Sequence, residues 1–298
     1  MPEYYKRNLG FFSEAEQKKV EESKVAVAGV GGDGFQLGLK LAMMGVEKFS
    51  IADPEVFEAE NSNRVLGATA LALGINKAEI FRQRVLELRP QAEIDVYTDG
   101  VTEENVEEFM YGANLVLDES ELTYPHIGAM IAREARKQEI PVEIAMNIGF
   151  AGVVTSLKPD AKFWTFERMM GIPKDMPLDE IKDVELDLGY ALPYLPTYGD
   201  LNTLRAVQDG APLPSITQGV DVASGIGSTE AFLHLISGKK GENHRREPTW
   251  NPRWAYYDSY AGESGKRLHV AKSGYYRSLA GVVMRNIMDI NPKANYKI

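Results

Sequence analysis

The chain has 298 residues, of which 44% are hydrophobic and 26% charged, as expected for a globular protein with a sizeable core. Its net charge of −10 and the lack of a basic block argue against a nucleic acid as the main partner, because binding phosphates requires clustered Lys and Arg. It contains no cysteine, which excludes disulfides, cysteine-ligated zinc and an enzyme thiolate as nucleophile.

The N-terminal segment does not resemble a signal peptide. MPEYYKRNLG is not followed by an apolar region of the signal-peptide kind, and no apolar run approaches the ~20 residues of a membrane span, so we expect a cytoplasmic protein without membrane contact. Ser13 with Glu16 three residues on predicts a capping box that opens a helix to about Ser23. Such a helix packs outside the sheet or on another subunit, so Arg7 is either a surface charge or an interface residue.

The stretch that follows combines a strand, a glycine-rich turn and a helix. Lys24–Ala28 is the apolar strand, and Leu37 to Met44 continue the helical pattern. This order places backbone N–H groups and a helix N-terminus where a phosphate can bind. The next strand, Lys48–Ala52, ends at Asp53, where an acid can reach a ribose hydroxyl. The pattern fits ATP or a dinucleotide, and also a tight turn without ligand.

Two later charged residues sharpen the site. Asn76 is a plausible N-cap of a helix that runs to Leu88, and Lys77 lies in its first turn, where a cation opposes the helix dipole unless it has an anionic partner. The strand over 114–117 leads into Asp118 at the carboxyl edge of the predicted sheet, where ligands of such folds gather. Asp118 can also be an ordinary strand-end or N-cap residue.

The remaining elements complete an α/β pattern. Further strands are predicted at 94–97, 141–146 and 152–157, helices at 103–110, 125–137 and 218–237, an antiparallel pair at 254–260 and 267–271, and a closing helix at 275–288. The segment 164–214 is long, aromatic and proline-bearing, so it is a candidate wall or lid. The four histidines lack a ligand-like spacing, and no histidine metal site is expected.

The motifs, taken in order, resemble the ThiF/MoeB superfamily, the adenylating relatives of ubiquitin-activating enzymes. They are the GVGGDG turn, GVEKFSIADPE, NSNR, Lys77 and LVLDES. The resemblance covers residues 4 to about 160 well and implies the ThiF/MoeB adenylation fold: a Rossmann-like, mixed but mainly parallel sheet flanked by helices, with a smaller antiparallel C-terminal portion. We expect one domain over 1–298, composed of an N-terminal helical segment (1–23), a nucleotide-binding core (24–160), a lid segment (161–216) and a C-terminal part (217–298).

The resemblance also implies a reaction and its residues. ATP with Mg²⁺ would adenylate a carboxylate, giving an acyl-adenylate and pyrophosphate; the carboxylate is the C-terminus of a peptide or of a ubiquitin-like or sulfur-carrier protein, or a small biosynthetic acid. Asp118 would hold magnesium, and Arg7 would reach across a homodimer into the partner's ATP site. The catalytic set is Arg7, Arg64, Lys77 and Asp118. The residues implied for ATP are Gly29, Gly31, Gly32, Gly34, Asp53, Glu55, Asn61, Arg64 and Lys77.

The chain departs from the family pattern in several places. Phe35 stands where serine is frequent, Val65 where glutamine is frequent, and Glu55 where aspartate is usual. Without cysteine, these 298 residues cannot form a thioester, so the nucleophile comes from the substrate, a second molecule or a partner protein. A non-catalytic adenylation-fold subunit and a nicotinamide oxidoreductase are the alternatives. The joint presence of Arg64, Lys77 and Asp118 speaks against both, because this set suits a triphosphate with magnesium.

Overall fold

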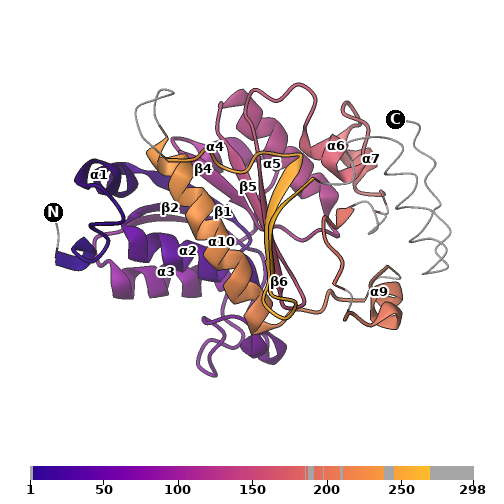
Figure 1. Ribbon diagram of the computed structural model, residues 1–298, viewed down its shortest axis with the longest axis horizontal. Helices are drawn as coiled ribbons and strands as arrows, with labels where there is room; N and C mark the ends of the chain where they lie inside the picture. Colours follow the sequence, from indigo (N-terminus) through magenta and orange to yellow (C-terminus); the bar gives the residue numbers. More distant parts are fainter. Residues whose placement is uncertain are drawn as a thin grey trace.

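One mixed sheet organises the molecule (Figure 1). The computed structural model describes residues 3–184, 186, 191–196, 198–208, 211–237 and 245–268. Within these ranges the strand order is β3-β2-β1-β4-β5-β6-β7-β8. The strands are β1 (Lys24–Ala28), β2 (Lys48–Ala52), β3 (Glu93–Tyr97), β4 (Leu115–Asp118), β5 (Val142–Ile148), β6 (Ala151–Leu157), β7 (Arg253–Asp258) and β8 (Glu263–Leu268).

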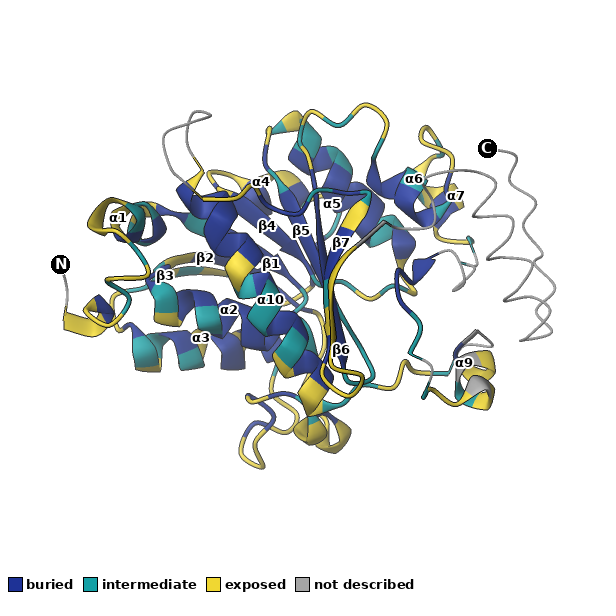
Figure 2. Cartoon of the chain, in the orientation of Figure 1, coloured by how far each residue is buried: buried dark blue, intermediate teal, exposed yellow. Residues whose placement is uncertain are grey.

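The sheet has a parallel and an antiparallel half. Strands β3, β2, β1, β4 and β5 pair in parallel, whereas β5 to β8 pair in antiparallel fashion. This confirms the predicted α/β fold with a mainly parallel sheet and an antiparallel C-terminal part. The parallel strands are short and buried on both faces at the centre, as Figure 2 shows.

Helices cover both faces of the sheet. One face carries α1 (Glu14–Glu22), α2 (Gly32–Met44), α3 (Lys77–Leu88) and α10 (Thr217–Ile236); the other carries α4 (Val106–Met110), α5 (Pro125–Lys137), α6 (Phe166–Met170) and α7 (Leu178–Ile181). The 3-10 helices η1 (Glu3–Tyr5) and η2 (Ala59–Asn63) and helix α9 (Leu201–Gln208) complete the described elements. None of the helices in the described ranges combines the length and the hydropathy of a membrane-spanning helix.

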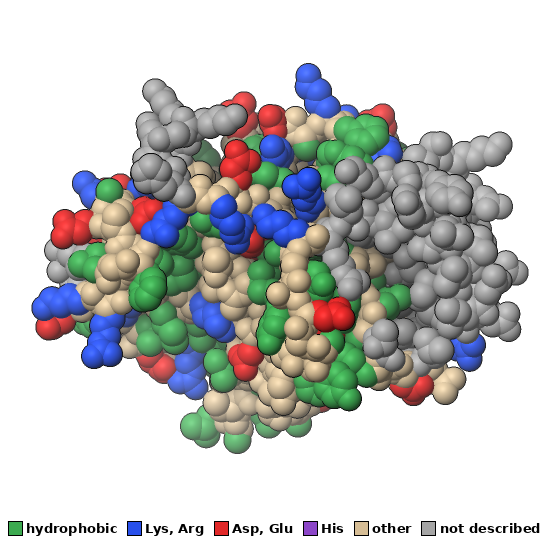
Figure 3. All heavy atoms as spheres, viewed as in Figure 1, with side chains coloured by type: hydrophobic (Ala, Val, Ile, Leu, Met, Phe, Trp, Pro, Cys, Tyr) green, Lys and Arg blue, Asp and Glu red, His purple; other side chains and the backbone are tan. Residues whose placement is uncertain are grey.

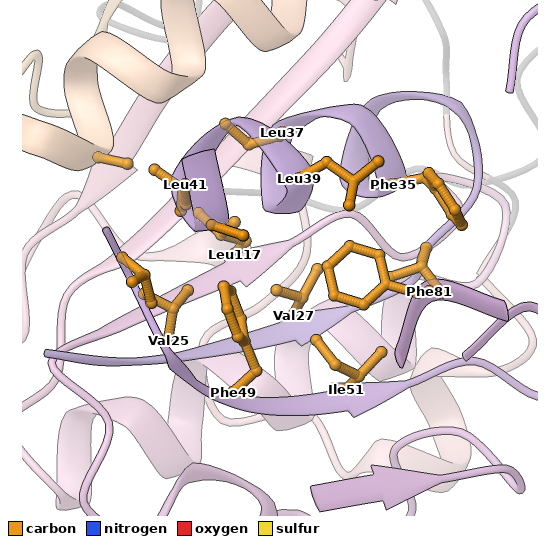
Figure 4. Close-up of a cluster of buried hydrophobic side chains, with 14 of the residues drawn as sticks. Val25, Val27, Phe35, Leu37, Leu39, Leu41, Phe49, Ile51, Phe81 and Leu117 are labelled. Atoms are coloured by element: carbon orange, nitrogen blue, oxygen red, sulfur yellow. The ribbon is translucent and has the colours of Figure 1, made fainter. Parts of the chain in front are cut away.

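Side chains of β1 alternate between two cores. Val25 and Val27 point toward α2, while Ala26 and Ala28 face the layer of α4 and α5. Figure 4 shows Val25 and Val27 below α2, whereas Leu37 lies on the far side of that helix. Because both faces of β1 are buried, the end of this strand is a rigid support for the turn that follows it.

The connections at β1 run in opposite directions. From β1 the chain crosses to β2 through α2 on one face, and it reaches β4, the other neighbour of β1, through α4 on the opposite face. The gap between the carboxyl ends of β1 and β4 is therefore a topological switch point, the place where ligands of open α/β sheets bind.

On the face drawn in Figure 3, basic and acidic side chains are interspersed with apolar ones.

The C-terminal strand pair differs from its predicted position. We expected 254–260 to pair with 267–271, but Arg253–Asp258 pairs with Glu263–Leu268. The reason is a tight turn at Gly262, which has φ +68° and donates its N–H to the Asp258 carbonyl at 2.8 Å. Residues 269–271 and the helix expected at 275–288 lie outside the described residues.

Candidate functional site

The glycine turn packs directly against the end of β4. Gly29 has φ +91°, and a Cβ there would lie 2.4 Å from the backbone oxygen of Glu119. A Cβ on Gly34 would lie 2.0 Å from the backbone oxygen of Gly29. No larger residue fits at either position without a backbone shift, so these two glycines are required by the close contact of the turn with β4.

The other two glycines face outward from this contact. A Cβ on Gly31 would meet nothing within 4 Å, and one on Gly32 would approach Val220 of α10 at 3.1 Å and the aliphatic part of Arg64 at 3.8 Å. Gly31 is the N-cap of α2 and supplies no side-chain hydrogen bond to the helix N-terminus. The first turn of α2 thus offers backbone N–H groups and the positive end of its dipole to an anion.

Asp53 fixes the turn from the end of β2. One carboxylate oxygen accepts the Val30 N–H at 2.8 Å and the other accepts the Glu55 N–H at 2.9 Å. Burial raises the pKa of Asp53, against the effect of these hydrogen bonds and of the charge of Lys77. The predicted ribose ligand is therefore also a structural clamp, and each oxygen keeps a lone pair for a hydroxyl donor.

Lys77 has the anionic partner that its position demands. Its ammonium group is buried and contacts the carboxylate of Glu55, whose side chain is 56% exposed. The Lys77 N–H donates to the Glu55 carbonyl oxygen at 2.9 Å, so backbone and side chain hold the same pair. The structure thus joins two of the predicted ATP residues beside Asp53, at the N-terminus of α3.

Arg64 reaches the glycine turn from the loop after β2. Its guanidinium donates to the Glu60 carbonyl at 3.1 Å and to the Asn63 side chain at 3.0 Å, and its methylene groups lie beside Gly32. Asn61, predicted to bind phosphate, is buried and its side-chain oxygen accepts the Glu58 N–H at 3.0 Å. That bond shapes η2 and thereby holds Arg64 over the N-terminus of α2.

Asp118 stands across the switch point, at the end of β4. One of its oxygens accepts the Ser120 hydroxyl at 2.6 Å, and a Cβ on Gly128 of α5 would lie 3.1 Å from the other. Burial raises the pKa of Asp118 to about 6, while the Ser120 hydrogen bonds act in the opposite direction. A buried, incompletely paired acid at this edge is a candidate ligand for a cation that accompanies phosphates.

Three polar residues that the sequence did not reveal complete the site. Asn147 donates its side-chain N–H to Asp33 at 2.7 Å, and the Ser215 hydroxyl donates to the Asn147 side-chain oxygen at 2.9 Å. The Ser215 carbonyl accepts Asn63 at 3.0 Å, which leads back to Arg64. The one local signal that could have identified Asp33 is its position between two glycines of a phosphate-binding turn. The residues that it connects to through hydrogen bonds are distant in the sequence.

Arg7 lies near the amino ends of the parallel strands, opposite the carboxyl ends where these residues lie. The neighbouring Asn8 donates to the Met44 carbonyl at 3.3 Å, and Tyr5 donates to Glu47 at 2.9 Å. Met44 is the last residue of the 13-residue helix α2, whose first turn faces the site. Arg7 is exposed and about 20 Å from the glycine turn of its own chain, given 1.5 Å of rise per residue. Within one chain, Arg7 is not part of the site.

A doubly wound sheet with a glycine turn, strand-end acids and cationic side chains at its switch point defines a nucleotide-binding protein of the Rossmann-like class. The chain belongs to the ThiF family, whose sequence model matches residues 5–272. The predicted recognition of this family is thereby confirmed.

Individual relatives match in part. The chain is 32% identical over 129 residues to the tRNA threonylcarbamoyladenosine dehydratase of Bacillus subtilis, covering 43% of this chain and 50% of that protein. It is 24% identical over 102 residues to the probable molybdopterin-synthase adenylyltransferase of Porphyra purpurea, covering 34% of this chain and 27% of that protein. Thus the chain spans at most half the length of these curated relatives.

Solved structures share the fold at low identity. The Escherichia coli protein MccB, solved with ATP, superposes with a TM-score of 0.63 at 14% identity, over 86% of this chain and 66% of MccB. PaaA superposes with a TM-score of 0.61 at 15% identity, again over 86% of this chain and 66% of that chain. These likenesses show a shared fold over most of the chain.

Proposed function

We propose that the chain is an ATP-dependent adenylating enzyme that converts a carboxylate to an acyl-adenylate and pyrophosphate, with no thioester on its own residues. The observation that carries this proposal is the convergence of Arg64 and the glycine turn at the N-terminus of α2, opposite Asp118. Membership of the ThiF family supports it, and so do the adenylyltransferase names of its relatives.

The residues present fit a nucleotide. A Cβ at Gly31 would enter open space in front of the helix N-terminus, so glycine leaves that space free for phosphate oxygens. Asp53 would hold the ribose at the end of β2, with Asn61 and Arg64 at the phosphates. Lys77 would offset the triphosphate charge from α3, with Glu55 as its partner.

They also fit a magnesium ion. In the described part of the chain no three acidic or histidine side chains form a metal cluster. A nucleotide-bound Mg²⁺ does not need one, because phosphates and waters supply most of its ligands and one or two carboxylates suffice. Asp118 would be that carboxylate, and the ion would neutralise phosphate charge when bound.

The chemistry requires two anions to meet. A carboxylate oxygen of the substrate attacks the α-phosphorus of ATP, the bond to the bridging oxygen breaks, and pyrophosphate leaves with that electron pair. Both reactants and the developing charge are negative, so donors and cations fixed before the reaction supply the main stabilisation. Arg64 can bind phosphate oxygens through two N–H groups at once, which a lysine cannot do.

We propose that the segment 161–216 is the wall of the substrate side of the site. The Tyr194 and Tyr198 hydroxyls donate to Asp258 of β7, and Tyr198 also accepts the Phe150 N–H at 3.0 Å. Ser215 ties the end of the segment to the nucleotide cluster. We propose a peptide C-terminus as one carboxylate that would bind at this wall; MccB has been solved with MccA-N7isoASN. We further propose that residues 1–298 act as one domain.

Nucleotide preference tests the proposal directly. ATP with Mg²⁺ should raise the melting temperature and NAD should not, because only a triphosphate with a cation uses Arg64, Lys77 and Asp118 together. At a ligand concentration of 100 times Kd the gain in unfolding free energy is about 2.7 kcal/mol. ATP–pyrophosphate exchange against peptides, ubiquitin-like proteins and small acids then identifies the carboxylate. A shift with NAD alone contradicts adenylation, and ATP binding without exchange across the panel points to a non-catalytic subunit.

A homodimer that shares sites makes a second prediction. If Arg7 of one subunit serves the site of the other, Arg7→Ala and Asp118→Ala proteins are each inactive, but a mixed dimer keeps one intact site. After subunit exchange, half of the dimers are mixed, so about one quarter of wild-type exchange activity should return. Lys6→Ala, a neighbouring exposed cation, is the matched control and should retain full activity. No recovery on mixing would place Arg7 in a surface role.

A further inference from the structure

Asp33 occupies an unusual place for an acid. It lies in the first turn of α2, between Gly32 and Gly34. Its Oδ2 accepts the Asn147 backbone N–H at 3.0 Å and the Asn147 side-chain N–H at 2.7 Å. Its Oδ1 is buried and has no hydrogen-bond partner in the described ranges. The carboxyl group is therefore held in one orientation, with one oxygen that the chain leaves without a donor.

The charges near Asp33 do not offset the effect of burial on its pKa. Arg64 from the loop after β2 and Lys40 from α2 favour its charged form, whereas Glu119 at the end of β4 is a like-charged neighbour. Asn147 is its contact on β5, and Asp118 and Glu143 act on Glu119 rather than on Asp33. Burial has the largest effect and raises the pKa of Asp33 to about 7. Burial thus shifts the protonation of Asp33 from acid pH toward neutral pH.

We propose that Asp33 is a further residue of the nucleotide site and takes up one proton when a triphosphate binds at the glycine turn; this inference rests on the function proposed above. The phosphates bring negative charge to the turn of α2 that carries Asp33, and like charges this close disfavour each other. Arg64, which offsets the charge of Asp33 in the free protein, would be drawn to the phosphates. Both effects favour the neutral carboxyl group, so solvent supplies one proton per ATP bound.

Calorimetry measures this proton directly. ATP with Mg²⁺ is titrated into the intact protein at pH 8 in HEPES and in Tris, whose ionisation enthalpies differ, so the difference in binding heat gives the number of protons taken up. We expect a value approaching one proton per ATP at pH 8. The Kd for ATP should rise by up to about tenfold between pH 7.5 and 8.5, because a linked proton contributes at most a factor of ten per pH unit.

Two variants assign the proton. Asp33→Asn keeps the size of the side chain and an oxygen for Asn147, and it should bind ATP without proton uptake and with an affinity independent of pH in this range. Glu143→Gln is the matched control: it removes another buried carboxyl group of raised pKa, under α10 and outside the proposed site. Proton uptake should persist in Glu143→Gln.

The outcomes separate the two proposals. ATP binding without proton uptake in the wild type, or uptake that persists in Asp33→Asn, overturns the role of Asp33 and leaves the adenylation proposal intact. Absence of ATP binding between pH 6 and pH 8.5 overturns the proposed function, and this inference with it. Uptake in the wild type and in Glu143→Gln but not in Asp33→Asn establishes Asp33 as the proton-binding residue of the site.

Discussion

Replacing Asp118 with alanine should lower carboxylate-dependent ATP–pyrophosphate exchange by at least about 100-fold, the effect of losing one preorganised electrostatic contact at a reacting centre. The protein should nevertheless stay folded. In the described structure the side chain of Asp118 accepts hydrogen bonds only from Ser120, and burial disfavours its charged form, as the pKa of about 6 indicates. Activity and stability are thus expected to move independently at this position, which a merely structural residue would not allow.

The measurement combines exchange kinetics with thermal unfolding. Asp118→Asn is the isosteric variant: it keeps the shape of the strand end and removes the charge, so it should be nearly as inactive as Asp118→Ala. Ser120→Ala, which removes only the hydrogen-bond partner, should retain most of the activity. Exchange at the wild-type rate in Asp118→Asn would take Asp118 out of the proposed magnesium site.

The second large effect concerns stability, at Glu143 in β5. Its side chain is 0% exposed, and neither carboxylate oxygen has a hydrogen-bond partner in the described part of the chain. It faces α10, where a Cβ on Gly227 would lie 3.1 Å from Oε1. Burial, reinforced by the charge of Glu230, raises the pKa of Glu143 well above its usual range. Glu230 itself is held by Arg246 at 2.6 Å and by the Thr249 N–H at 2.7 Å.

Glu143→Met should therefore increase the free energy of unfolding by about 1–3 kcal/mol, the cost of an unsatisfied buried polar group. The gain should grow with pH. The folded protein keeps the Glu143 proton while the unfolded chain releases it near pH 4.3, so wild-type stability falls as the pH rises from there through the folded-state pKa. Chemical denaturation between about pH 5 and pH 8 measures this slope.

Glu143→Gln separates the two contributions. It removes the titration but keeps an unpaired polar group, so its stability should depend less on pH than that of the wild type without the full gain of methionine. Equal pH slopes for wild type and Glu143→Gln would show that Glu143 is not the buried proton-binding group.

The parts of the site that sequence alone could predict are those built from adjacent residues. A strand, a glycine turn and a helix N-terminus are contiguous, so the turn at residues 29–34 and the acids at positions 53 and 118 follow from the order of elements. Because a cation is unfavourable at a helix N-terminus, the position of Lys77 predicted an anionic partner. Only the fold identifies Glu55, 22 residues away, as that partner.

The parts that could not be predicted depend on tertiary contacts. Asn147 and Asp33 are 114 residues apart, and Ser215 and Asn63 are 152 apart. Asn and Ser are common in loops because their side chains bond to nearby backbone, so the flanking sequence does not identify Asn147 or Ser215 as site residues. Glu143 could not be predicted either. It lies inside an apolar strand, and the sequence around it does not indicate that its carboxylate lacks a hydrogen-bond partner. Strand β8 begins at Glu263, earlier than predicted, because the chain turns at Gly262. The position of this turn sets the pairing register of β7 with β8.

The position of α10 in the chain has a consequence for biosynthesis. Side chains of β5 and β6 such as Ala145 and Val154 belong to the same core as Ala231 and Phe232 of α10, a helix made after the whole segment 158–216. At translation rates of about 5–20 residues per second, the ribosome needs about 4–16 s to pass from the end of β6 to the end of α10. During that interval the nascent chain displays an uncovered apolar sheet face, and we expect chaperones to engage it there.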